Sequence, residues 1–119
     1  MSAAIERIQN IVIVTLGERM DIFNAPALMK QLNQLVGNGA TRFIVDLSAV
    51  RMVDADGDYP LLHLLKRAQE VGGSVSLVCP QGNPIRVFYE MMRLDTLFEM
   101  TETLDAALAQ IELTQEAVV

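Results

Sequence analysis

Three carboxylates alternate in the segment Asp54-Ala55-Asp56-Gly57-Asp58, directly before a predicted helix. A carboxylate in such a place accepts hydrogen bonds from the free N–H groups of the first turn. It also opposes the positive end of the helix dipole, which contributes ~0.3–1 kcal/mol per charge. This structural role explains one carboxylate but not three. Because Pro60 lacks an N–H, it fits the first turn better than the second, so we expect Asp58 or Gly57 to be the N-cap.

Two kinds of chemistry could use these carboxylates. A calcium loop of the EF-hand type needs glycine at its sixth position and glutamate at its twelfth, but counting from Asp54 these positions hold Tyr59 and Leu65. The segment also resembles the Asp-x-Asp-Gly motif of haloacid-dehalogenase-type phosphatases, in which the first aspartate is a nucleophile and the second an acid/base. That motif should close with threonine, where this chain has Asp58, and the further lysine and carboxylate motifs are missing. A phosphohydrolase therefore remains a remote alternative.

The composition narrows the classes of function. The chain has 119 residues, 51% of them hydrophobic, and a formal net charge of −6, which fits one domain over residues 1–119. We expect its core to span about residues 5–111 and residues 113–119 to fray. The net negative charge disfavours binding to nucleic acid and to anionic membrane surfaces. No apolar run approaches ~18 residues and no secretory signal begins the chain, so we expect no membrane insertion and a cytoplasmic location.

Metals and cofactors have few candidate ligands in this sequence. Cys79 is the single cysteine and His63 the single histidine, which excludes an internal disulfide and leaves zinc with too few of its usual ligands. The Gly72-Gly73 pair ends a predicted helix instead of opening one, so it does not form a phosphate-binding loop. We expect no metal and no cofactor, and we expect Cys79 to be a small core residue.

The hydrophobic pattern predicts a single α/β domain with the element order ββαβαβαβα. Runs of β-branched residues predict strands, and apolar residues at helical spacing predict helices. Strands that alternate with helices favour parallel neighbours, while the opening hairpin makes the sheet mixed. We expect four to five strands and about four helices, with Asn24 capping the first helix and Thr101 or Thr103 the last. The expected strands are 4–8, 11–16, 42–47, 74–79 and 97–100, and the expected helices are 24–36, 61–71, 84–92 and 104–111.

The whole chain, from about Ile5 to Ile111, resembles the STAS domain, the module of anti-sigma factor antagonists and of sulfate-transporter tails. Each matching segment is weak alone, but six of them in the right order are strong. They are Leu16-Gly17-Glu18-Arg19-Met20-Asp21, Asn24-Ala25-Pro26-Ala27-Leu28, Ile44-Val45-Asp46-Leu47-Ser48-Ala49-Val50, Val53-Asp54-Ala55-Asp56-Gly57, Gly72-Gly73-Ser74-Val75-Ser76-Leu77-Val78 and Leu94-Asp95-Thr96-Leu97-Phe98.

The resemblance implies a non-enzymatic partner-switching protein. In the antagonists, the unphosphorylated domain binds an anti-sigma factor that is also a serine kinase of the histidine-kinase-like ATPase type. That kinase phosphorylates the serine just before the loop glycine, the complex dissociates, and a serine phosphatase resets the switch. A phosphate adds roughly −1.5 to −2 charges beside a helix N-terminus, which alters the docking surface electrostatically.

This chain departs from the family at the phosphoacceptor position. Asp56 stands there and Ala55 precedes it, so neither residue has a hydroxyl group to phosphorylate. Asp56 places a permanent negative charge at that position and so mimics the phosphorylated state in part, whether it is a natural variant or an engineered one. Asp58 adds a second charge where antagonists usually carry an apolar residue. We expect the switch loop to comprise Asp54, Ala55, Gly57 and Asp58 around Asp56.

Residues that could contact the partner lie on two predicted helices. Tyr59, His63, Lys66, Arg67, Met91 and Met92 are the candidates. A solvated role is the simpler interpretation of His63, and core packing is the simpler one for Phe88 and one of the two methionines. An alternative function is a constitutive STAS subunit of a larger signalling or transporter-associated assembly, which would not need an acceptor serine.

Overall fold

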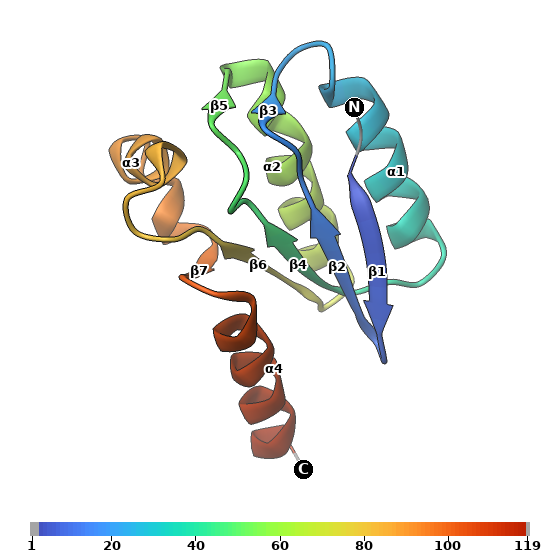
Figure 1. The fold of residues 1–119 in the computed structure, drawn as a ribbon. Coiled ribbons are helices and arrows are strands. Elements are labelled where there is room, and N and C mark those ends of the chain that lie inside the picture. The colour runs from blue at the N-terminus through green and yellow to red at the C-terminus, as the bar shows by residue number, and fades with distance from the viewer. Residues whose placement is uncertain (1–2, 119) are drawn as a thin grey trace.

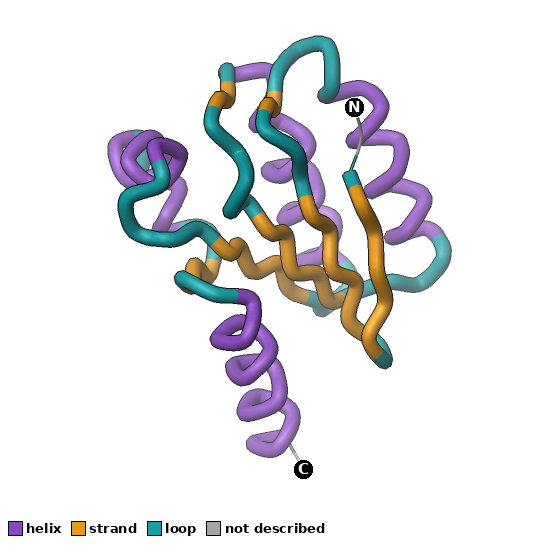
Figure 2. Tube along the Cα trace, in the orientation of Figure 1, coloured by secondary structure: helices purple, strands orange, loops and turns teal. Residues whose placement is uncertain are grey.

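The computed structural model describes residues 3–118, with the exception of the side chains at positions 55, 56 and 112–118. Figures 1 and 2 show strands and helices alternating along the chain. In chain order the elements are β1 (Ala4–Ile8), β2 (Ile11–Thr15), β3 (Arg19–Met20), α1 (Ala25–Gly37), β4 (Arg42–Asp46), β5 (Met52–Val53), α2 (Ala55–Glu70), β6 (Ser74–Val78), α3 (Pro84–Met91), the 3-10 turn η1 (Leu94–Thr96), β7 (Glu99–Thr101) and α4 (Leu104–Val118).

The main sheet has five strands in the order β1-β2-β4-β6-β7. Only the pairing of β1 with β2 is antiparallel, and the other neighbours are parallel. The central strands are buried on both faces, which explains the continuous apolar runs at residues 11–14 of β2 and 43–45 of β4; in β6 the buried Ser76 interrupts the run. The mixed sheet, together with the four helices of the described residues, confirms the predicted α/β fold.

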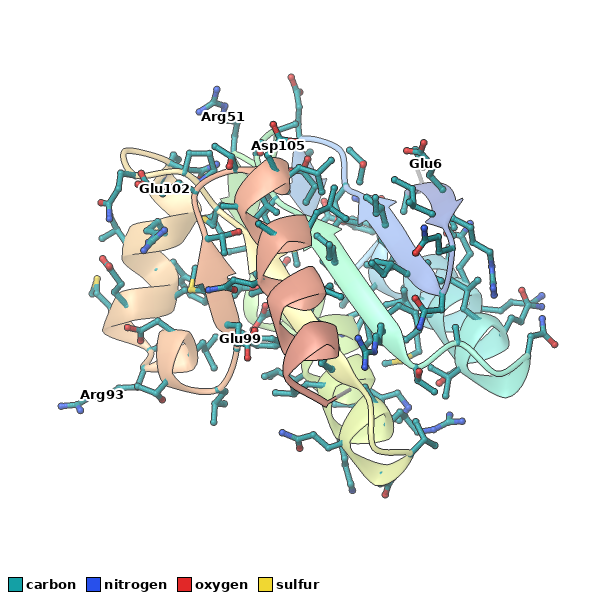
Figure 3. All side chains as sticks on the ribbon, turned by 90° about the horizontal axis from the view of Figure 1, so that it is seen from below. Glu6, Arg51, Arg93, Glu99, Glu102 and Asp105 are labelled. Carbon is teal, nitrogen blue, oxygen red and sulfur yellow. The ribbon has the colours of Figure 1, made fainter. Side chains whose placement is uncertain are left out.

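Helices cover both faces of the sheet (Figure 1). Strand β2 shows the division, because Val12 and Val14 pack in the core formed with α1 and α2, whereas Ile11 and Ile13 pack against Ala107 of α4. Figure 3 shows α4 lying across the sheet in a view from below, with Asp105 in its first turn. No helix in the described part of the chain is long and apolar enough to cross a membrane.

Two short strands position the candidate site, and neither of them was predicted from the sequence. Arg19–Met20 of β3 pairs in parallel with Met52–Val53 of β5, forming a separate two-stranded sheet. In Figure 2 these strands follow the carboxyl ends of β2 and β4. The pairing holds the entrance of α1 beside the entrance of α2, so two loops distant in sequence become neighbours.

The start of α2 corrects one expectation. The helix begins at Ala55 with Asp54 as N-cap, and Pro60 lies inside the helix, in its second turn. The expectation that Asp58 or Gly57 is the N-cap is therefore wrong, and both residues belong to the helix. Asp58 N–H donates to the carbonyl oxygen of Asp54 over 3.2 Å, which places the first helical hydrogen bond ahead of the proline. Pro60 has no backbone N–H, so the helix lacks one hydrogen bond at this position. The helix tolerates this loss because contacts at its entrance fix the earlier start.

The starts of helices α3 and α4 agree more closely with the sequence predictions. Asn83 caps α3 by accepting a hydrogen bond from Ile85 N–H over 2.8 Å. Thr103 Oγ1 accepts from Ala106 N–H over 3.1 Å at the start of α4, as predicted for one of the two threonines. Helix α4 continues to Val118, beyond the expected end at Ile111.

Candidate functional site

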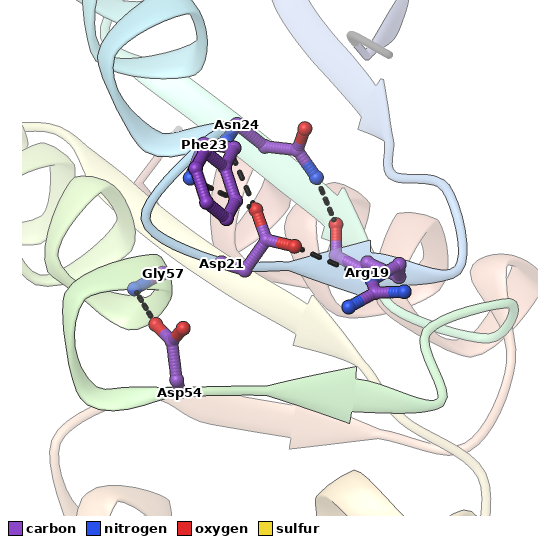
Figure 4. A network of polar contacts seen from close by, with 6 residues as sticks. All are labelled: Arg19, Asp21, Phe23, Asn24, Asp54 and Gly57. Atoms are coloured by element: carbon purple, nitrogen blue, oxygen red, sulfur yellow. Dashed lines mark hydrogen bonds and ion pairs between the residues drawn. The ribbon is translucent and has the colours of Figure 1, made fainter.

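The segment that carries the carboxylates is fixed by a hydrogen bond within its own helix entrance, drawn in Figure 4, and by a backbone hydrogen bond to β3. Asp54 Oδ1 accepts a hydrogen bond from Gly57 N–H over 2.7 Å, which satisfies a free donor of the first turn of α2. The backbone N–H of Asp54 donates to the carbonyl oxygen of Met20 over 3.1 Å. Asp54 itself is exposed, and Asp56 lies in the first turn of α2.

Gly57 is required by a close approach between the two loops. A Cβ atom added at this position would lie 1.9 Å from the carbonyl oxygen of Met20 and 2.5 Å from the backbone nitrogen of Asp21. No side chain fits against backbone at these distances, so the contact depends on the absence of a Cβ. The first turn of α2 therefore packs directly on the segment that leads from β3 to α1.

Asp21 holds that neighbouring segment in place. Its Oδ1 accepts hydrogen bonds from the backbone N–H groups of Phe23 over 3.0 Å and Asn24 over 3.1 Å, and its Oδ2 lies 3.3 Å from Arg19 Nε (Figure 4). A carboxylate that accepts from backbone N–H groups two and three residues further on stabilises a turn of this kind. Asn24 is the N-cap residue of α1, as predicted, but its side chain makes no capping hydrogen bond. Its Nδ2 donates instead to the carbonyl oxygen of Arg19 over 2.9 Å.

Asp58 does not add a charge to the surface of the loop. Its side chain is 3% exposed, and its Oδ1 accepts a short hydrogen bond from the hydroxyl group of Tyr89, which is fully buried. Burial raises the pKa of the Asp58 carboxyl above its usual 3.8, and the Tyr89 hydrogen bond opposes part of that shift. Burial and the neighbouring Asp58 likewise raise the pKa of Tyr89. The pair ties the N-terminal part of α2 to α3.

Sequence reasoning missed this pair, because Tyr89 was not among the candidate residues. One signal was available, because Ile85 and Tyr89 are four residues apart and share one helix face. Ile85 is 3% exposed and lies in the core, so that face points inward.

The remaining candidates lie at different depths along α2. Tyr59 is 57% exposed and stacks on His63, with ring centroids 6.1 Å apart and planes inclined by 21°. Lys66 is exposed, whereas Arg67 is half-buried and donates from Nη1 to Asn33 Oδ1 of α1 over 2.9 Å. Arg67 therefore joins the two helices.

Both methionines of α3 and its C-cap are exposed, Met91 at 78% and Met92 at 59%. The expectation that one of them packs in the core is wrong, because Tyr89 occupies the buried position instead. Phe88 is half-buried against the core and Cys79 is buried, as predicted. Among the described side chains, no three of His, Cys, Asp and Glu gather closely enough to hold a metal ion.

Known proteins resemble this chain in sequence and in fold. The family model described as the STAS domain matches residues 2–107. The anti-sigma-F factor antagonist RsfB of Mycobacterium tuberculosis is 28% identical over 102 residues, which cover 85% of this chain and 81% of that protein. This chain is thus similar to an anti-sigma factor antagonist along most of its length.

Solved structures share the fold at lower identity. An anti-sigma factor antagonist from Mycobacterium paratuberculosis superposes with a TM-score of 0.81 at 23% identity, covering 93% of each chain. The unphosphorylated anti-sigma factor antagonist SpoIIAA superposes with a TM-score of 0.73 at 18% identity, covering 93% of this chain and 98% of that one. Because the family model spans nearly the whole chain and the fold agrees with it, this chain belongs to the STAS domain family.

Proposed function

We propose that this protein is a non-enzymatic partner-switching regulator, an anti-sigma factor antagonist that docks on an anti-sigma factor kinase through the 54–58 loop and helix α2. The partners are a serine kinase of the histidine-kinase-like ATPase type and, for antagonists that carry a serine at the switch, a serine phosphatase. The similarity to RsfB along most of the chain supports this class of function.

The position of residue 56 is the observation that carries the proposal. Asp56 lies in the first turn of α2, between the N-cap Asp54 and a glycine that is pressed against β3. A negative charge in a first turn is favoured by the free N–H groups and by the helix dipole. A phosphate on a serine at this position would be tolerated by the fold and would act on the partner.

In this proposal, Asp56 permanently mimics part of the effect of a phosphoserine at this position. A carboxylate carries one charge and two oxygens, against nearly two charges and three oxygens for a phosphate. The charge acts at the docking surface, where a partner that accommodates a neutral serine must desolvate it or oppose it. We therefore expect this chain to bind the kinase more weakly than the variant Asp56→Ser does.

The geometry gives little support to a phosphohydrolase built on the same motif. Asp54 Oδ1 is engaged as the helix cap, and the carboxyl group of Asp58 is buried against Tyr89. The strand before the motif, β5, has two residues and belongs to the small second sheet. An Asp-x-Asp-Gly nucleophile needs an open carboxylate at the end of a long central strand.

A capture experiment tests the proposal. The chain, Asp56→Ser and Asp56→Ala are immobilised in parallel and exposed to lysate of the source cell, and bound proteins are identified by mass spectrometry. We expect the serine and alanine variants to retain a histidine-kinase-like ATPase that the parent chain retains less. Equal retention by all three would contradict the charge switch and favour a constitutive STAS subunit of a larger assembly.

A further inference from the structure

Helix α3 turns an apolar face to solvent, away from the face that it buries. Ile85 and Tyr89 point into the core and are 3% and 0% exposed. Val87, in contrast, is 54% exposed and Met91 is 78% exposed. The exposed Pro84 lies three residues before Val87, so it shares one side of the helix with Val87 and Met91. We call Pro84, Val87 and Met91 the α3 stripe.

The exposed apolar surface continues past the end of this helix. Met92, the C-cap residue of α3, is 59% exposed, and Leu97, directly after η1, is 53% exposed. Methionine side chains are flexible and adapt to the surface that they meet. Apolar side chains gathered in this way on one exposed segment are typical of a protein-binding surface.

The charges of this segment favour a second copy of the chain as the partner. Residues 84–96 contain two cations, Arg86 and Arg93, and two anions, Glu90 and Asp95, whereas the whole chain has a net charge of −6. Arg86 Nε lies 3.7 Å from Glu90 Oε2, so these two charges offset each other. Two acidic chains repel each other over most of their surface, and the repulsion is smallest where the local charge is zero. A basic partner would find more negative charge elsewhere on this protein.

Arg93 has a backbone conformation that arginine rarely adopts. Its φ of 60° and ψ of 23° lie in the left-handed region, directly after the C-cap Met92. Glycine is the usual residue at this position because it has no Cβ atom. Among the described side chains, no carboxylate forms an ion pair with the guanidinium group of Arg93. A strained residue at the surface with an unpaired charge indicates a use for that charge outside its own chain.

An exposed carboxylate lies at the other end of α3. Glu102 Oε1 accepts a hydrogen bond from Gln81 N–H over 3.3 Å, two residues before Asn83, the N-cap of α3. In Figure 3 Glu102 and Arg93 lie at opposite ends of this helix. The helix between them has eight residues. Its length is therefore about 12 Å, at 1.5 Å per residue.

Other charges accompany these two residues. Asp95 lies two residues after Arg93 and is exposed, and Figure 3 shows the exposed Arg51 and Asp105 on the same side of the molecule as Glu102. Each end of the α3 surface thus carries both signs of charge. A two-fold axis through the middle of the helix exchanges its ends, so the cation of each end meets an anion of the other copy.

We propose that the protein forms a dimer in which the α3 stripes of two copies pack antiparallel about a two-fold axis. In such an interface every contact occurs twice. Met91 of one copy packs beside Pro84 and Val87 of the other, and each Arg93 pairs with Glu102 of the other copy. The dimer goes beyond the proposed function and does not depend on it, since residues 54–58 take no part in the contact.

Sedimentation equilibrium of the full chain, at concentrations up to about 1 mM, measures this association. We expect the average mass to rise with concentration from that of one chain toward that of two. Val87→Asp should weaken the association at least roughly tenfold, because it places two charges in the apolar contact. Val71→Asp is the matched control, at a valine that is 51% exposed at the end of α2, and it should associate like the parent chain.

A charge exchange tests the two-fold arrangement itself. Arg93→Glu and Glu102→Arg, each alone, bring like charges together in both contacts and should weaken the association roughly fivefold or more. In an equimolar mixture of the two variants, the introduced glutamate faces the introduced arginine in one contact, and the native Arg93 faces the native Glu102 in the other. The mixture should therefore associate more tightly than either variant alone. Arg93→Gly suits the left-handed backbone, so it should keep the fold, followed by circular dichroism, and still weaken the dimer.

Four results would overturn the proposal. They are a chain that is monomeric at every concentration, an equal loss in Val71→Asp, no gain in the mixture of the two charge variants, and assembly beyond two chains, which a closed two-fold interface forbids. Self-association that changes in Asp56→Ser would place the contact at the 54–58 segment instead of α3 and would overturn it as well.

Discussion

The buried pair Asp58 and Tyr89 allows a quantitative test of how the switch helix is tied to α3. Tyr89→Phe removes one hydroxyl group and keeps the ring, whose packing against Phe88 and Phe98 is unchanged. Asp58 is 3% exposed, so its Oδ1 loses its hydrogen-bond donor with little access to water. A hydrogen bond to a charged buried group contributes about 1.5–3 kcal/mol, and we expect a loss of about 2 kcal/mol in the free energy of unfolding. For a domain of this size that corresponds to a Tm lower by about 8 °C.

A double-mutant cycle isolates the interaction. Urea unfolding is followed by circular dichroism at neutral pH for the parent chain, Tyr89→Phe, Asp58→Asn and the double variant. With a neutral amide in place of the carboxylate, the loss of the hydroxyl should cost about 1 kcal/mol, so the two changes are not additive. A change below about 0.5 kcal/mol for Tyr89→Phe, or strict additivity in the cycle, would refute the interpretation of a strong charged hydrogen bond.

Three further predictions follow from the same region. Because burial raises the pKa of Asp58 above 3.8, the folded chain binds this proton more tightly than the unfolded chain, and stability falls as pH rises from 3.8 through the folded pKa. Asp58→Asn removes that term, so its stability relative to the parent should rise over this pH interval in urea titrations; a constant difference would contradict the raised pKa. Gly57→Ala should lower the free energy of unfolding by more than about 3 kcal/mol, because its Cβ would lie 1.9 Å from the carbonyl oxygen of Met20. Thermal unfolding measures this change, and a loss below about 1 kcal/mol would show that the two loops separate easily. Asp54→Ala should cost about 1 kcal/mol through loss of the bond to Gly57 N–H, whereas Asp54→Asn or Asp54→Ser should retain most of it; equal losses in all three would contradict a capping role.

The central strands could be predicted from sequence because burial leaves a plain signal. Strands that helices cover on both faces need apolar residues at almost every position, as at residues 11–14 of β2 and 43–45 of β4. The helices were equally visible through their apolar spacing. The two-residue strands β3 and β5 carry no period at all, since two residues cannot establish one. Their pairing exists because β2 and β4 deliver both segments to the same end of the sheet.

The start of α2 shows how a local argument can fail. The preference of Pro60 for a first turn is correct for an isolated helix, but it competes with contacts made by the preceding residues. Asp54 accepts from Gly57 N–H, and Gly57 packs on the backbone of Met20. Those contacts require the helix to begin before Gly57. Pro60 then lies in the second turn, where the helix lacks the hydrogen bond that an N–H at this position would donate. Such an outcome depends on a neighbour more than thirty residues away in the chain.

The candidate site was predictable in part for a similar reason. The segment of alternating carboxylates and its similarity to the STAS switch motif indicate the 54–58 segment as the candidate site, because both signals are local in sequence. The burial of Asp58 depends on Tyr89, which is 31 residues distant and belongs to another helix. The exposure of Phe23 depends on the turn held by Asp21, and an aromatic residue in a sequence is more often part of a core.

The affinity of the captured kinase for this chain and for Asp56→Ser tests the central claim most directly. Isothermal titration calorimetry at one fixed salt concentration compares the two forms, together with the serine form after phosphorylation by the kinase. We predict that the serine form binds more tightly than the parent chain by about tenfold or more, and that phosphorylation weakens its binding to the parent's level or below. Equal or weaker binding by the unphosphorylated serine form would contradict the claim that the charge at position 56 sets the state of the switch.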